Sequence, residues 1–231
     1  MKKTIKKIIP SFLLEYYYLS KNKGKYKGVS AEKTFTDIYE TNLWSNGESM
    51  SGPGSTLKQT EVVRTELPRI FAQFNIKSML DIPCGDFNWM KDVDLSNVDY
   101  IGSDIVKEMI LKNESTYSTD KIHFRQLNLL KDDLPQVDLI FCRDCFIHFS
   151  YNDISIAIEN IKKSRSKYLL TTTYFKKKKN IDIVTGDFRP INLEKEPFSF
   201  PSALYKINEE CTEVADLYAD KCLYLWQIDT L

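Results

Sequence analysis

The chain has 231 residues, of which 42% are hydrophobic and 13% aromatic. A chain of this length and composition can bury one sizeable core, so we expect a single domain. Lysine plus arginine (32) equals aspartate plus glutamate (32). This balance argues against a nucleic-acid partner, because such proteins usually carry a basic stripe. The five cysteines are an odd number in a chain too large to need disulfides, a usage typical of the reducing cytoplasm.

Residues 1–56 are predicted to form an arm ahead of a core domain at 57–231. Four lysines between residues 2 and 7 precede an apolar stretch at 8–19, but polar residues and Pro10 interrupt it and no small-residue cleavage site follows. The stretch is also too short and too polar to span a bilayer. Tyrosines at 16–18 and lysines at 21–27 permit two interpretations: weak contact with an anionic membrane surface, or an aromatic arm packed on the main domain.

The core begins with a predicted helix at 58–74, where apolar residues recur at helical spacing and Pro68 marks a kink or break. A second helix is predicted at 154–163, with Asn152 or Asp153 placed to cap its start. Between and after these helices, short apolar runs predict strands at 78–82, 99–105, 122–127, 137–142 and 168–173. Strands that alternate with helices in this way predict an α/β fold with a mostly parallel sheet covered on both faces.

The pattern changes after residue 176. Residues 202–208 and 222–229 are predicted strands, and a short helix is expected at 209–219 between them. In an open parallel sheet, ligands bind outside the carboxyl ends of the strands. The functional residues are therefore expected just after Ile82, Ile105, Leu127 and Cys142.

Two polar turns follow the first two predicted strands. The first, Asp81-Ile-Pro-Cys-Gly-Asp-Phe87, contains Gly85, which allows the backbone to approach a ligand closely. The second, Tyr100-Ile-Gly-Ser-Asp104-Ile, ends in a carboxylate roughly twenty residues further on, the separation that brings an acidic side chain to a bound ribose. Each turn also has an ordinary interpretation: a tight strand-to-loop turn for the first, and a carboxylate that caps the next helix for the second.

These two turns are followed by Arg125-Gln-Leu-Asn-Leu129 and Val137-Asp-Leu-Ile-Phe-Cys-Arg-Asp-Cys-Phe-Ile-His-Phe149. In this order the segments resemble the class I S-adenosylmethionine-dependent methyltransferases over residues 77–149, including those associated with bacterial capsule and surface polysaccharides. The resemblance implies a Rossmann-like fold with a mostly parallel seven-stranded sheet and an N-terminal helical extension. It also implies S-adenosyl-L-methionine as cofactor and S-adenosyl-L-homocysteine as product. The chain departs from the glycine-rich turn of the family at Pro83 and Phe87.

In that family the first turn passes under the cofactor, and the resemblance implies roles for the residues around it. Asp104 is expected to accept both ribose hydroxyls, and Asn128 to face the adenine edge, with a turn asparagine as the alternative. The loop at 43–56 is expected to offer amides and hydroxyls to the methionine carboxylate, with a plain connector as the alternative. The predicted cofactor-binding set is Trp44, Ser51, Gly52, Ser55, Asp81, Pro83, Cys84, Gly85, Asp86, Trp89, Asp104, Ile105, Asn128, Leu129 and Arg143.

The candidate catalytic residues follow the fourth predicted strand. His148 is the expected general base for a hydroxyl acceptor, because histidine is the usual base near neutral pH; a histidine bound to backbone at the start of a helix is the alternative. Arg143 either presents its guanidinium to a carboxylate or phosphate of a ligand, or pairs with Asp144. Cys142 and Cys145 have metal-ligand spacing without a second pair, and no metal site is predicted. The expected acceptor contacts are Tyr174, Arg189 and Asn192.

The resemblance implies methyl transfer to a small polar acceptor, most simply O-methylation of a sugar, a sugar phosphate or a related precursor in capsule or surface-polysaccharide synthesis. An RNA methyltransferase is a first alternative, which the neutral net charge disfavours. A nicotinamide-dependent oxidoreductase would share the strand-turn-helix start but needs glycines where this chain has Pro83 and Asn88. A non-catalytic module that binds the cofactor without transferring its methyl group is a third alternative.

Overall fold

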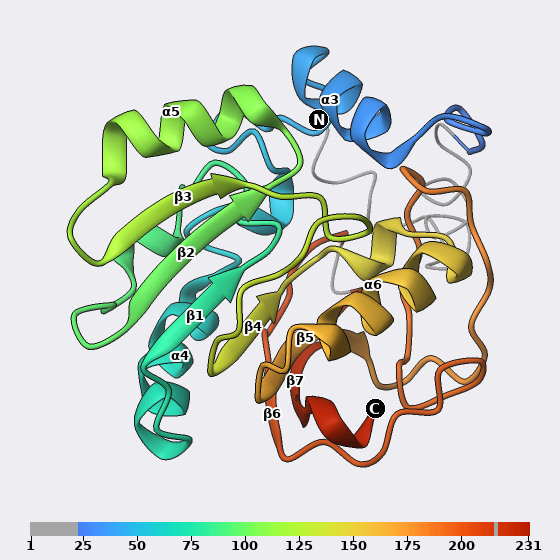
Figure 1. Ribbon diagram of the computed structural model, residues 1–231. Helices are drawn as coiled ribbons and strands as arrows, with labels where there is room; N and C mark the ends of the chain where they lie inside the picture. Colours follow the sequence, from blue (N-terminus) through green and yellow to red (C-terminus); the bar gives the residue numbers. More distant parts are fainter. Residues whose placement is uncertain (1–22, 215–216) are drawn as a thin grey trace.

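A single sheet is the centre of the computed structural model, which describes residues 23–214 and 217–231 (Figure 1). Within these residues, seven strands lie in the order β3-β2-β1-β4-β5-β7-β6. The strands are β1 Ser78–Asp81, β2 Asp99–Asp104, β3 Ile122–Gln126, β4 Leu139–Cys142, β5 Tyr168–Tyr174, β6 Tyr205–Asn208 and β7 Lys221–Gln227. The α-helices are α3 Ala31–Glu40, α4 Glu61–Gln73, α5 Lys107–Tyr117 and α6 Tyr151–Lys163.

In the described sheet six strands run in one direction, and β7 runs in the opposite direction. Leu80 of β1 lies opposite Ile101 of β2 and Ile140 of β4, both in parallel register. β7 is antiparallel to β5 and to β6, so the sheet ends in an antiparallel pair. The predicted mostly parallel, seven-stranded Rossmann-like sheet is therefore confirmed, and the change of pattern after residue 176 corresponds to its antiparallel edge.

Two apolar cores cover the two faces of the sheet, because successive strand residues point to opposite sides. Leu80, Ile140 and Leu169 pack with α6 in one core. Their neighbours in sequence, including Met79 and Phe141, pack with α4 in the other core. Every residue of β4 is buried, as expected for a parallel strand with helices on both sides.

Three local predictions need correction. α6 begins at Tyr151, and its N-cap is Ser150, whose hydroxyl accepts from the amide of Asp153; neither Asn152 nor Asp153 is the cap. Of the two expectations for Pro68, a kink or a break, the break is wrong, because this residue lies inside α4 without ending it. The helix predicted at 209–219 is absent from the described part of that segment, where residues 213–214 and 217–219 form turns.

The described part of the N-terminal segment lies over the carboxyl ends of the central strands. α3 begins after Ser30, whose side chain caps the amide of Lys33, and crosses the molecule beyond the arrowheads of β1 and β2 (Figure 1). The predictions made for residues 8–19 and for the tyrosines at 16–18 lie outside the described residues. Among the helices of the described ranges, none combines the length and the apolarity needed to cross a membrane.

Candidate active site

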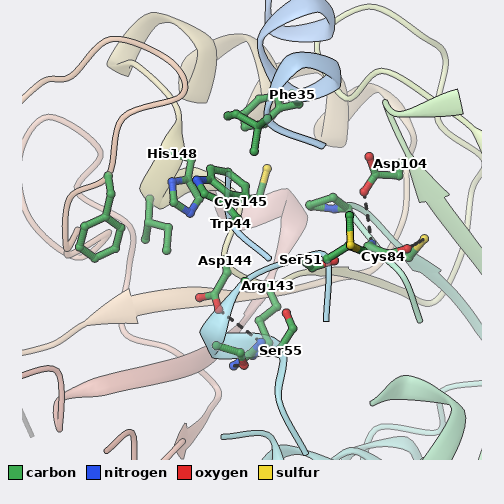
Figure 2. A pocket seen from close by; sticks show the side chains of 18 of the residues that line it. Phe35, Trp44, Ser51, Ser55, Cys84, Asp104, Arg143, Asp144, Cys145 and His148 are labelled. Carbon is green, nitrogen blue, oxygen red and sulfur yellow. Dashed lines mark hydrogen bonds and ion pairs between the residues drawn. The ribbon is translucent and has the colours of Figure 1, made fainter. Parts of the chain in front are cut away.

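A cavity of about 720 Å³ lies at the carboxyl ends of β1, β2 and β4. Figure 2 shows Asp104 and Cys84 on one side of it, His148 and Trp44 on the other, and Arg143, Asp144 and Ser55 between them. Most of the residues predicted from the sequence line this cavity: Trp44, Ser51, Gly52, Ser55, Asp81, Pro83, Cys84, Gly85, Trp89, Asp104, Ile105, Asn128, Leu129, Arg143, His148 and Tyr174. Asp86, Arg189 and Asn192 do not line it.

The turn after β1 faces the carboxylate at the end of β2. Gly85 has a positive φ of 59°, and a Cβ at this position would overlap the hydroxyl of Ser51. Its amide donates to Asp104 Oδ2 at 3.2 Å, and the amide of Val106 donates to Oδ1 at 3.0 Å. A carboxylate has about four acceptor positions, so Asp104 retains lone pairs that can accept two hydroxyl groups. Burial raises the pKa of Asp104 to about 6, although these amides oppose the shift.

Asp81 is the second buried carboxyl group of the cavity. The hydroxyl of Tyr100 donates to Asp81 Oδ2 at 2.7 Å. Burial raises the pKa of Asp81 to about 8, and the nearby Asp104 adds to this shift while the Tyr100 hydrogen bond opposes it. At neutral pH Asp81 is therefore mostly protonated, and a cation placed beside it would displace the proton.

Asn128 is a turn residue that also lines the cavity. Its side-chain Oδ1 accepts from the amide of Leu130 at 2.9 Å, and its own amide donates to Asp132 at 2.7 Å. The alternative of a turn asparagine is therefore confirmed, and the contact with adenine stays a prediction. The carboxamide oxygen is engaged in the turn, so the side-chain NH₂ is the group that Asn128 has to offer a ligand.

The loop ahead of α4 is bound to the turn after β1. Asp86 accepts from the amide of Met50 at 2.7 Å and from the hydroxyl of Ser49 at 3.0 Å. In return, the amide of Asp86 donates to Ser51 Oγ at 3.1 Å. Asp86 thus holds the loop in place from outside the cavity, while Ser51, Gly52 and Ser55 line the cavity wall. The contacts fix the position of the loop, and its role toward the methionine carboxylate stays a prediction.

Arg143 belongs to a buried network of charges at the floor of the cavity. Its Nη2 donates to Glu209 Oε2 at 2.6 Å and to the carbonyl oxygen of Gly54 at 2.9 Å. Its Nη1 lies 3.3 Å from Asp144 Oδ2, which also accepts from Lys221 Nζ at 2.6 Å. Burial by itself raises the pKa of Asp144, but the positive charges of Arg143 and Lys221 outweigh it and hold this pKa well below its usual range. The pairing with Asp144 was one of two expectations for Arg143, whereas Glu209 and Lys221 were not expected in this network.

His148 lies at the end of the short 3-10 helix Phe146–His148 that follows β4. Its Nδ1 is 2.9 Å from the carbonyl oxygen of Asp187, which can only accept, so Nδ1 carries the proton and Nε2 is the unprotonated nitrogen of the neutral ring. The ring stacks on Trp44, with centroids 4.4 Å apart. Burial lowers the pKa of His148 to about 4, despite the bond to Asp187.

Two of the three predicted acceptor contacts have structural environments instead. Arg189 is fully buried and donates to the carbonyl oxygens of Phe146 at 2.6 Å and Phe149 at 2.9 Å. Asn192 is also buried and donates to backbone carbonyls. Both follow β5 as expected, but their side chains point into the fold and not into the cavity. The cavity is also lined by four residues that were not among the predicted contacts, namely Phe35, Phe188, Glu213 and Tyr218.

Neither a protein-family model nor a curated protein matches this chain, but solved structures do. Human N-acetylserotonin methyltransferase in complex with S-adenosylmethionine matches with a TM-score of 0.59 and 14% identity over 94% of this chain, which spans 66% of that enzyme.

The N-methyltransferase NodS from Bradyrhizobium japonicum WM9, in complex with S-adenosylhomocysteine, matches with a TM-score of 0.58 and 12% identity, covering 82% of this chain and 97% of NodS. The methyltransferase domain of bacterial CtHen1-C has a TM-score of 0.53 and 12% identity, covering 74% and 98%. Identities this low show the fold alone. Together with the strand order of the sheet, they show that the chain has the Rossmann-like fold of the class I methyltransferases.

Proposed function

We propose that the protein binds S-adenosylmethionine and transfers its methyl group to a hydroxyl of a small polar acceptor. The observation that carries the proposal is the cradle formed by the Gly85 turn and the carboxylate of Asp104, in a cavity that continues to His148. A Cβ at residue 85 would overlap Ser51 in the cavity wall, and Asp104 has acceptor positions for two ribose hydroxyls. The neighbours that hold this cofactor or its product share the same fold.

The cavity residues fit the three parts of the cofactor. Asn128 and Leu129 would contact the adenine, Asp104 the ribose, and the 51–55 loop the methionine carboxylate. Asp81, which is mostly protonated at neutral pH, would ionise beside the cationic part of the cofactor. When bound, the cofactor supplies an electrophilic methyl group on a sulfonium. The protein has to align the acceptor with that group and exclude water.

His148 suits the role of general base toward a hydroxyl. Its Nδ1 proton is fixed by the carbonyl of Asp187, so Nε2 is the nitrogen that can accept a proton, and this nitrogen has no hydrogen-bond partner among the described residues. The ring is neutral above pH 4 or so, which keeps the base available throughout the physiological range. Nε2 would take the hydroxyl proton as the acceptor oxygen is methylated.

The charges at the cavity floor favour an acceptor without a phosphate group. Among the described residues, the two cations that line the cavity are Arg143 and Lys221, and both are held in ion pairs with Asp144 and Glu209. A phosphate would have to break these buried pairs, which is costly. The rings of Trp44 and Phe188 beside His148 provide flat surfaces suited to one face of a sugar ring. We therefore propose an unphosphorylated sugar hydroxyl, with capsule or surface-polysaccharide synthesis as the context suggested by the sequence resemblance.

Calorimetry of the pure protein with S-adenosylhomocysteine tests the first half of the proposal. Asp104→Asn removes the charge that accepts the ribose hydroxyls and should weaken binding about a hundredfold, since each hydrogen bond to a charged group contributes about 1.5–3 kcal/mol. Asp99→Ala, at the exposed start of the same strand, is the matched control and should bind as the parent does. Absence of uptake by the parent protein, or uptake of NADH in its place, contradicts the proposal.

The second half is tested by methyl transfer from labelled cofactor to a panel of sugars, each offered with and without a phosphate group. Methylation of the unphosphorylated member of a pair is the expected result. Exclusive methylation of the phosphorylated member would overturn the charge argument while leaving cofactor binding intact.

A further inference from the structure

We propose that Asp187 is a positioning residue that couples residues 23–44, called here the N-terminal segment, to His148. Docking of this segment then sets the tautomer of His148 and its exposure to water. The inference rests on the proposed function for the role of His148, but the coupling itself is a property of the free protein. Asp187 contacts the backbone amide of Gly24 and the imidazole ring of His148, which lie far apart in the chain.

The first contact is made by the backbone of Asp187. Its carbonyl oxygen accepts from His148 Nδ1 at 2.9 Å. Two further backbone bonds hold the same loop against the turn that carries His148: Gly186 N to the His148 carbonyl at 2.8 Å, and Arg189 N to the Ile147 carbonyl at 3.0 Å. A movement of loop 186–189 therefore moves the group that fixes the imidazole.

The second contact is made by the Asp187 side chain. Both of its carboxylate oxygens lie 3.0 Å from the amide nitrogen of Gly24, which is 163 residues away in the chain. Tyr26 and Thr34 pack beside this contact on Gly186, where an added Cβ would come within 2.8 Å of Tyr26 and 2.6 Å of Thr34. The N-terminal segment is thus fitted to the loop that holds His148, through an oriented hydrogen bond and through close packing.

The same N-terminal segment also covers His148 from its other side. Trp44 stacks on the imidazole, and Phe35 of α3 contacts Trp44, with ring centroids 5.9 Å apart. Burial is the main cause of the low pKa of His148; of the charges that face the ring, Asp144 raises the pKa, while Arg189 and Lys221 lower it. Release of the segment would admit water, which favours the charged imidazolium.

The test uses the two histidines of the chain. Long-range ¹H–¹⁵N spectra of the full-length protein report the tautomer and the pKa of each ring, and His123, exposed on β3, is an internal reference. In the parent protein His148 should show the Nδ1–H tautomer. In Asp187→Ala, whose backbone carbonyl remains, His148 should show a mixture of tautomers and a pKa raised from about 4 toward its ordinary value of about 6.5. His123 should not change.

Two variants separate positioning from general loosening. Asp187→Asn keeps an oxygen that accepts from Gly24 and should restore the parent signals of His148. Asp37→Ala removes a carboxylate of α3 that accepts from Tyr26 and Lys25. It leaves the Gly24 contact and should leave His148 unchanged. In the methyl-transfer assay, Asp187→Ala should lower kcat at least tenfold with little change in the affinity for S-adenosylhomocysteine.

An Nε2–H tautomer in the parent protein overturns the proposal before any variant is made. So does a His148 signal in Asp187→Ala that matches the parent, or one in Asp37→Ala that changes as much as in Asp187→Ala. These spectra need neither cofactor nor acceptor. Failure of cofactor binding with intact coupling would therefore remove the proposed function and leave Asp187 as the residue that sets His148.

Discussion

Adding one methyl group at residue 85 probes the cradle directly. Gly85 is buried, and its φ of 59° lies in the left-handed region, where alanine costs roughly 1–2 kcal/mol more than glycine. The new Cβ would also overlap Ser51 Oγ, which forces that hydroxyl to rotate away from the amide of Asp86, at a cost of about 1 kcal/mol for the hydrogen bond. Gly85→Ala should therefore lower the free energy of unfolding by about 2–3 kcal/mol.

A double-mutant cycle with Ser51→Ala separates the two contributions. Ser51→Ala alone loses the hydrogen bond from Asp86, about 1 kcal/mol. In the double variant the overlap with the hydroxyl is gone and the hydrogen bond is lost only once, so its destabilisation should fall about 1 kcal/mol short of the sum of the single variants. Urea unfolding followed by circular dichroism measures each free energy, and calorimetry should show at least tenfold weaker S-adenosylhomocysteine binding in both Gly85 variants.

Additive effects within about 0.5 kcal/mol would refute the contact between residues 85 and 51, because independent sites behave in that way. A Gly85→Ala variant that unfolds as the parent does would refute the left-handed turn itself. Unchanged affinity for S-adenosylhomocysteine in a folded Gly85→Ala variant would place the cofactor elsewhere.

Three further predictions concern the ionisable residues of the cavity. At pH 7, cofactor binding should release nearly one proton from Asp81, whose pKa of about 8 falls beside a cation; calorimetry in phosphate and in Tris measures the release, and Asp81→Asn should abolish it. Affinity for S-adenosylhomocysteine should decrease as the pH falls, and more steeply below about 6, because Asp104 with its raised pKa is then protonated; in Asp104→Asn the added steepness should vanish. His148→Ala should leave cofactor affinity nearly unchanged and lower kcat roughly a hundredfold or more. In the parent protein, kcat should fall on the acid side only near pH 4, where His148 becomes protonated. A fall near pH 6.5, or unchanged turnover in the variant, removes His148 as the base.

Local pattern in the sequence placed the strands of the sheet and put Gly85 and Asp104 at strand ends. The positions of strands and helices follow from the spacing of apolar residues, which can be read directly from the sequence. Gly85 lies in the turn after β1 and Asp104 is the last residue of β2, and parallel neighbours bring both strand ends to one edge of the sheet. The errors at Ser150 and at 209–219 concern helix ends and an irregular segment, where the periodic signal is weakest.

Tertiary packing alone decided which groups meet inside the cavity. Arg143 pairs with Glu209, 66 residues away, and Asp144 with Lys221, 77 residues away, although no spacing links them. Arg189 follows the expected strand, yet it binds backbone carbonyls inside the fold. The period of apolar residues in the sequence shows which face of a helix or strand is buried. The direction of a particular side chain and its partner far along the chain are set only when the elements pack. The contact of Asp187 with Gly24 on one side and His148 on the other is such a case, because its three members lie in separate parts of the chain.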